Sequence, residues 1–303
     1  MPLPDLITLH HGATHLQVCP AAGGSIVRFW HDDGHKVQDW LRPVSQQAIS
    51  QQQGRDMGCY PLVPYCNRIR AGRFNFQDLE IKLPLNAAPQ KHSLHGHGWQ
   101  TAWQVVSVNE RCVTLNYQHA ADAWPWDYQA QQTFALSRQT LRVDLQIENL
   151  SDCAMPVGLG VHPFFIRTPQ TQVYAQVDQI WLTDPEIMPT ELVTAEPERD
   201  PKQGIWVDQV ALDNNYTHWG GLARIKWPEC GAEMTLCADS PFDNLVIFAP
   251  TNQSIVCVEP VSQVTDAVNL AERSDTGLHS LEPGLMFSAS ASFYYAFIGE
   301  NAR

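Results

Sequence analysis

Glu259 is the acidic residue whose sequence context best suits proton transfer. It closes the apolar run 255–258, and the two-residue period of a strand places its carboxyl group on the same face as Ile255 and Cys257. A carboxyl group that faces a dry cavity has a raised pKa, which suits a general base. A glutamate at the solvent end of an edge strand would show the same pattern, so both interpretations stay open.

His162 is the matching candidate for a proton donor. Pro163 holds it in an extended conformation, and Phe164 and Phe165 give it apolar surroundings. An unperturbed histidine has a pKa of about 6.5 and can donate a proton near neutral pH. The alternative interpretation is a buried histidine that is satisfied by one hydrogen bond to a backbone group.

Three histidines lie close together at His92, His95 and His97. If His95 and His97 were on a strand, both rings would point to one side, as a metal site requires. Gly96 and Gly98 instead predict a bent loop, and no suitably spaced glutamate or cysteine follows. We therefore expect no metal here.

Asn67 and Arg68 belong to a segment, residues 64–74, in which hydrogen-bonding side chains lie between proline and glycine. The pattern is typical of a turn that presents donors to a ligand. An arginine cluster on a solvated surface loop would look the same.

These residues are carried by a chain that alternates between apolar and polar residues nearly throughout. The alternation is clear over residues 113–117, 141–148 and 287–297, and residues 225–237 have the pattern of a hairpin. Short strands separated by turns predict an all-β fold, a large antiparallel β-sandwich, as a single domain over residues 1–303.

Two polar stretches predict surface loops within that domain. Residues 183–204 contain four prolines, and residues 46–53 are rich in glutamine.

Charge and composition exclude several classes of protein. The 303 residues include 19 Lys+Arg and 32 Asp+Glu, a net charge of −13, so we expect no binding to nucleic acid. No apolar run approaches the roughly 20 residues of a membrane span, and the first residues lack an export signal. We therefore expect no contact with membranes. The eight cysteines form no C-x-x-C pair, which favours a reducing, cytoplasmic location.

Taken together and in this order, the motifs resemble those of the aldose 1-epimerase (galactose mutarotase) family. The matching segments are PYCNRIRAGRF, HSLHGHGW, WPWDYQAQQTFALS, GLGVHPFF, ALDNNYTHW, VCVEPVSQVTDAVN and LEPGLMF. They cover most of the chain, from about Gly23 to Phe297. The resemblance implies the galactose mutarotase-like supersandwich, which agrees with the strand alternation.

The resemblance also implies a role for each matching residue in catalysis. Glu259 would be the general base that takes the proton of the anomeric hydroxyl, and His162 the general acid that protonates the ring oxygen. His95 would bind near the ring oxygen and orient the sugar.

Further matching residues would bind the sugar itself. Asp213 and Arg68 would bind hydroxyls, with Asn67 supporting the turn that carries Arg68. His97 and Trp99 fall in the segment that would form the rim around the sugar. His97 takes an unusual place in the motif, and packing is its alternative role.

The implied activity is aldose 1-epimerisation of a free hexose, with a monosaccharide as the partner and no cofactor. Two alternatives remain: a hexose-6-phosphate 1-epimerase, in which Arg70 and Arg73 could bind the phosphate, and a non-catalytic sugar-binding protein on the same scaffold. We expect a monomer or a homodimer.

Overall fold

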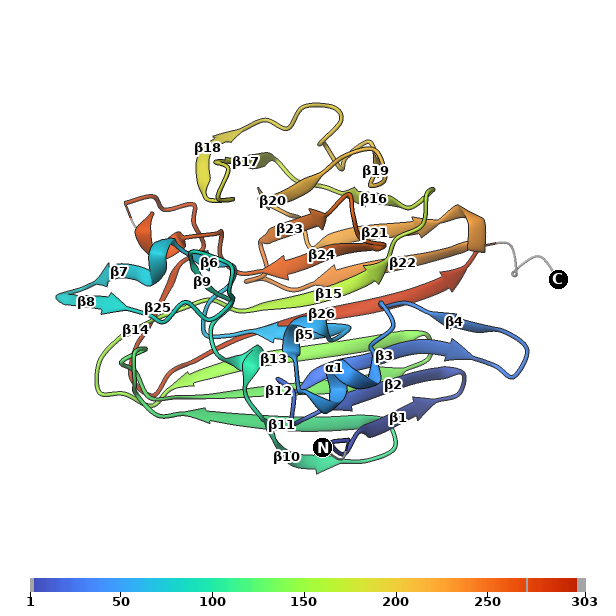
Figure 1. The fold of residues 1–303 in the computed structure, drawn as a ribbon, viewed down its shortest axis with the longest axis horizontal. Helices are drawn as coiled ribbons and strands as arrows, with labels where there is room; N and C mark the ends of the chain where they lie inside the picture. The colour runs from blue at the N-terminus through green and yellow to red at the C-terminus, as the bar shows by residue number, and fades with distance from the viewer. Residues whose placement is uncertain (1–2, 271, 299–303) are drawn as a thin grey trace.

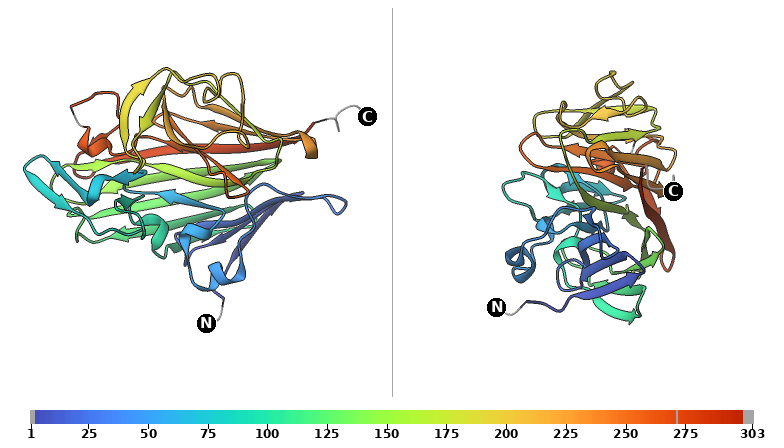
Figure 2. Two further views of the ribbon diagram at one scale, coloured as in Figure 1. Left: turned by 45° about the horizontal axis from the view of Figure 1, so that its top comes forward. Right: turned by 90° about the vertical axis from the view of Figure 1, so that its right-hand side faces the viewer.

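Two large antiparallel sheets form the body of the molecule (Figures 1 and 2). The computed structural model describes residues 3–270 and 272–298. The 11-stranded sheet has the order β1 (Ile7–His11), β2 (Thr14–Cys19), β3 (Ser25–Asp32), β5 (Cys59–Leu62), β15 (Gly160–Ile166), β24 (Ile255–Val261), β23 (Asn244–Ala249), β20 (Leu212–Thr217), β17 (Gln179–Thr183) and β18 (Pro189–Val193), with β4 (Val37–Asp39) paired to β3.

The second sheet has nine strands, and its long central strands β13 and β26 run side by side through the molecule (Figure 1). Its order is β10 (Gln104–Val108), β11 (Cys112–His119), β12 (Tyr128–Ser137), β13 (Thr140–Asn149), β26 (Met286–Phe297), β22 (Ala232–Ala238), β21 (Leu222–Trp227), β16 (Gln172–Ala175) and β19 (Ile205–Trp206).

Small elements decorate the ends of these sheets. The two-stranded ladders are β6 (Arg68–Ile69) with β9 (Ser93–Leu94), β7 (Arg73–Phe76) with β8 (Leu79–Lys82), and β14 (Met155–Val157) with β25 (His279–Leu281). The helical elements are α1 (Gln46–Ser50) and the 3₁₀ turns η1 (Gly54–Asp56), η2 (Arg70–Gly72), η3 (Gly98–Gln100), η4 (Pro228–Cys230) and η5 (Ala267–Asn269). Within the described residues, no helix has the length and apolar content needed to cross a membrane.

The main hydrophobic core is formed by the facing surfaces of the two sheets. It includes Val161 of β15, Val256 and Val258 of β24, and Leu145 of β13. The intervening residues of β15 and β24 point to the other side of the first sheet, where they are also buried. Strands buried on both faces explain why these two segments are apolar without a clean alternation.

The predicted all-β fold is confirmed, with two corrections in detail. The alternating segment 141–148 lies within β13, and the hairpin over residues 225–237 is β21 and β22. Residues 183–204, predicted as a loop, contain the edge strand β18. The glutamine-rich segment contains helix α1, because the hydroxyl of Ser45 accepts a hydrogen bond from the backbone of Ala48 and caps its first turn.

Candidate active site

A pocket of about 350 Å³ opens on the face of the first sheet that points away from the main core. Its floor is formed by buried side chains of β5, β15 and β24, including His162 and Glu259. Its rim is exposed and includes the residues Arg55, Asp56, Pro89, Gln90 and Gln253. The volume lies at the small end of the range for ligand sites, as a single sugar ring requires.

Glu259 and His162 meet at the floor of this pocket. The register of β15 against β24 pairs Gly160 with Val261 and Phe164 with Cys257, so the residues midway between them lie opposite each other. The Nε2 atom of His162 is 3.3 Å from Oε1 of Glu259, and their side chains are only 8% and 2% exposed. Two segments far apart in the chain therefore bring a carboxyl group and an imidazole into contact at one place.

The environment of the pair favours the neutral form of both groups. Burial, together with the negative charge of Asp213, raises the pKa of Glu259 well above its usual value. Burial and then the charge of Arg42 lower the pKa of His162 to about 3. The pKa near 6.5 expected for His162 is therefore wrong, because that value takes no account of burial or of Arg42. Two groups in contact at 3.3 Å titrate as a pair and not separately.

His95 approaches the pair from the small ladder of β6 and β9. Its ring atom Nδ1 accepts a hydrogen bond of 3.0 Å from the backbone N–H of Asn67. The backbone N–H of His95 donates to the Asn67 carbonyl at 2.9 Å. Because Nδ1 is an acceptor, the ring proton is on Nε2. The ring lies 5.2 Å from that of His162, at 85° to it, and burial keeps the pKa of His95 well below its usual value. His95 is thus a neutral hydrogen-bond donor beside the pair.

Arg68 and Asp213 form the polar wall of the pocket. The side-chain oxygen of Asn67 accepts from the backbone N–H and from Nη1 of Arg68, at 2.9 and 3.0 Å. Nη2 of Arg68 then donates to Oδ2 of Asp213 at 3.0 Å. Arg68 and Asp213 both line the pocket, so the chain of contacts offers a fixed donor and a fixed acceptor to a ligand.

Aromatic residues complete the walls. Tyr60 lies 4.6 Å from the ring of His162 and is stacked on Trp99 at 5.4 Å. Trp99 is buried and lines the pocket, in line with its predicted position at the rim of the sugar site. Phe164 stacks on His162 at 4.4 Å. The guanidinium carbon of Arg42 lies over the other ring of this stack, 3.6 Å from the centre of Phe164.

Sequence reasoning missed Tyr60, Arg42 and Asp266. Tyr60 and Arg42 line the pocket but belong to no chemical motif. Asp266 acts on the turn that carries Arg68: its backbone N–H donates to the Arg68 carbonyl at 2.9 Å, and its carboxylate accepts from the Arg70 N–H at 2.9 Å. The only available signal for Asp266 was its place in the matching segment VCVEPVSQVTDAVN.

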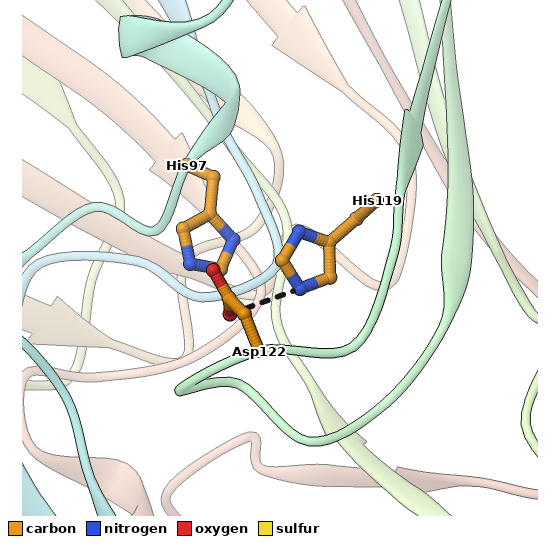
Figure 3. Close-up of side chains that lie close together, drawn as sticks. All are labelled: His97, His119 and Asp122. Carbon is orange, nitrogen blue, oxygen red and sulfur yellow. Dashed lines mark ion pairs between the residues drawn. The ribbon is translucent and has the colours of Figure 1, made fainter.

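His97 is not brought to the pocket with the other predicted residues. Its ring is stacked on that of His119 at 4.5 Å (Figure 3). Its Nδ1 lies 3.1 Å from the hydroxyl of Tyr128. It is absent from the residues that line the pocket. The structure therefore favours the packing alternative for His97 over contact with a ligand.

Comparison with known proteins gives one consistent result. The model of the aldose 1-epimerase family matches residues 5–294. The uncharacterized protein YphB of Escherichia coli is 32% identical over 294 residues, 92% of this chain and 94% of its own length. A solved candidate aldose 1-epimerase of Escherichia coli has a TM-score of 0.88 at 30% identity, covering 97% of this chain and 99% of its own. A galactose mutarotase-like protein of Clostridium acetobutylicum has a TM-score of 0.85 at 20% identity, covering 97% and 95%.

Proposed function

Because the chain belongs to the aldose 1-epimerase family, we propose that it interconverts the α and β anomers of a free hexose. The observation that carries this proposal is the contact of 3.3 Å between Glu259 and His162 at the floor of a sugar-sized pocket. A protein that only binds sugar has no use for two buried titratable groups held in contact.

Ring opening needs one proton removed from the anomeric hydroxyl and one added to the ring oxygen. A pair with one shared proton can do both, because one member accepts while the other donates. In our proposal the shared proton first moves from Glu259 to His162. The anomeric hydroxyl then gives its proton to Glu259 while His162 protonates the ring oxygen as the C1–O5 bond breaks, which returns the pair to its neutral form. The C1 carbonyl group of the open aldehyde then turns about the C1–C2 bond. The reverse proton transfers re-form the C1–O5 bond and give the other anomer.

The neighbouring groups would hold the sugar for this exchange. The Nε2–H of His95 can donate a hydrogen bond near the ring oxygen of the sugar. Arg68 can donate to sugar hydroxyls, and Asp213 can accept from them. The reaction moves only protons, so the proposed chemistry calls for no cofactor. We propose a free monosaccharide as the partner; the cytoplasmic location and the monomeric or dimeric state stay predictions.

Polarimetry on freshly dissolved α-D-glucose and α-D-galactose tests the proposed function. We expect the wild-type protein to speed the approach to anomeric equilibrium in proportion to its concentration, for at least one of the two sugars. The same change measured by saturation-transfer NMR gives an independent rate. Rates equal to buffer for both sugars and for glucose 6-phosphate would remove the proposal.

Glucose 6-phosphate in the same assay tests the phosphate-specific alternative. The residues predicted to bind a phosphate lie outside the pocket: Arg70 contacts Asp184 at 3.5 Å and Asp266 at 3.6 Å, and Arg73 is exposed on β7. We therefore expect no preference for the phosphorylated sugar. A clear preference for it would assign that role to Arg42 or Arg55, which do line the pocket.

The pH dependence of kcat/KM follows from the shared proton. The pair is active while it holds one proton, so the alkaline limit is the raised pKa of Glu259 and the acid limit is the lowered pKa of His162, about 3. We expect a level profile from about pH 5 to 6.5, and an alkaline fall whose midpoint lies above that range. Rates corrected for buffer catalysis check this, and a fall centred near pH 6.5 would contradict it.

A further inference from the structure

A second cluster of titratable side chains lies outside the pocket, between the start of η3 and the end of β11 (Figure 3). It consists of His97, His119 and Asp122. One ligand-type atom from each lies within 4.8 Å of the others, and Nε2 of His119 is 3.4 Å from Oδ1 of Asp122. The proposed reaction does not use any of the three.

Both histidines make a side-chain hydrogen bond through the same ring nitrogen. Nδ1 of His97 lies 3.1 Å from the hydroxyl of Tyr128, and Nδ1 of His119 lies 3.3 Å from that of Tyr117. Both Nε2 atoms consequently point toward the carboxylate of Asp122 (Figure 3). Metal-binding histidines are oriented in the same way, by a hydrogen bond at the nitrogen that does not bind the metal.

The Nε2 atoms are poorly satisfied by the protein itself. Within residues 3–270 and 272–298, Nε2 of His97 has no hydrogen-bond partner. Nε2 of His119 has two long contacts, 3.4 Å to Asp122 and 3.3 Å to the carbonyl of Trp124. Both partners of His119 Nε2 only accept, so this nitrogen carries the ring proton here and gives it up when it binds a metal. An ion that replaces these two long contacts would meet two imidazole nitrogens beside one carboxylate.

We propose that His97, His119 and Asp122 form a binding site for a divalent transition metal ion, with Zn²⁺ as the best match. This departs from the expectation of no metal at the histidine-rich segment, because His119 and Asp122 come from another part of the chain. Two imidazoles and one carboxylate are a preferred donor set for zinc, and a water would take the fourth position. Tetrahedral ligands with zinc bonds of 2.0–2.2 Å lie about 3.4 Å apart, which is the present separation of the His119 and Asp122 atoms. Because the two rings are nearly parallel, at 9°, one of them must rotate to direct its lone pair at the ion.

The cluster is accessible from solvent. The side chain of Asp122 is 61% exposed, so an ion can enter from solvent. A bound ion would join the turn after β11 to η3, the element that carries the pocket residue Trp99. A bound ion would therefore stabilise one wall of the pocket.

Isothermal titration of the untagged full-length protein with ZnCl₂ tests the proposal, with Co²⁺ absorption as a second readout. We expect one equivalent of Zn²⁺ to bind, a rise in Tm of a few degrees, and the visible absorption of tetrahedral Co²⁺ without a thiolate band. We expect the affinity to fall about 100-fold in His119→Gln and at least about tenfold in Asp122→Asn. The exposed Asp122 keeps the test valid if the buried His119 variant fails to fold.

Two control variants locate the ion. His218→Gln removes an exposed histidine 3.7 Å from the carboxylate of Asp178, a pair without a second histidine. Glu259→Gln removes a ligand from the other cluster of metal-binding residue types, His162, Cys257 and Glu259. Both should bind zinc as the wild type does. No binding by the wild type, unchanged affinity in both cluster variants, or loss of binding in Glu259→Gln would overturn the proposal, whatever the sugar assay shows.

Discussion

Replacement of Glu259 by glutamine is expected to lower kcat for anomer interconversion by roughly two to four orders of magnitude. Glutamine fills the same space and can still contact His162, but it cannot accept the proton of the anomeric hydroxyl. The measurement is the initial rate by polarimetry, with KM determined separately to show that binding is retained. The matched control is Glu110→Gln, which removes an exposed carboxylate paired with His10 and should leave the rate unchanged.

The same substitution should make the protein more stable at neutral pH. The pKa of Glu259 is raised by folding, so its contribution to stability is complete below its unfolded pKa of about 4.3 and is lost as the pH rises through the folded pKa. Glutamine does not titrate. We therefore expect the Tm of Glu259→Gln to exceed that of the wild type by about 2–6 °C near pH 7.5, with a smaller difference near pH 4.

Calorimetry at the two pH values distinguishes this effect from general damage. A variant that is inactive because it is misfolded would have a lower Tm, whereas an inactive variant with a higher Tm has lost a group retained for function. A Tm difference that does not change with pH would contradict the burial of a titrating carboxyl group at residue 259.

Local pattern predicted the strands and singled out both members of the proposed catalytic pair, whose roles came from the resemblance. Alternation identified β13, and the aromatic surroundings of His162 and the apolar run before Glu259 marked both as unusual. Their contact depends on the register of β15 against β24, which is set by long-range pairing and not by either segment alone. A chain of buried strands offers many registers, so sequence patterns could suggest the pair but could not place it.

The position of His97 shows where local pattern misleads. It lies two residues from His95, and on a strand both rings would share one side. The structure has left-handed backbone at His95 and Gly96, with φ of 60° and 69°, which turns the chain between the two histidines. A Cβ atom at Gly96 would lie 2.2 Å from the Val63 carbonyl oxygen, so only glycine allows this close approach. His97 consequently joins His119, which comes from a different part of the chain.

The pocket electrostatics could not be predicted either. The lowered pKa of His162 comes first from burial and then from Arg42, a residue in no motif whose Nε donates to the Met57 carbonyl at 2.9 Å. The resemblance supplied a donor and an acceptor as separate groups. The structure places the two groups in contact at 3.3 Å, and in our proposal they share one proton. This difference has a measurable consequence in double substitution.

His162→Gln is expected to lower kcat by roughly two to three orders of magnitude, and adding it to Glu259→Gln should cost little more. A catalytic pair that works through one shared proton is disabled when either member is lost, so the double variant should be within about threefold of the slower single variant. Rates for the wild type, both single variants and the double variant complete the cycle, with Tm confirming that each is folded. If the two losses multiply, the groups act independently, and the contact between Nε2 and Oε1 at 3.3 Å does not describe the catalytic unit.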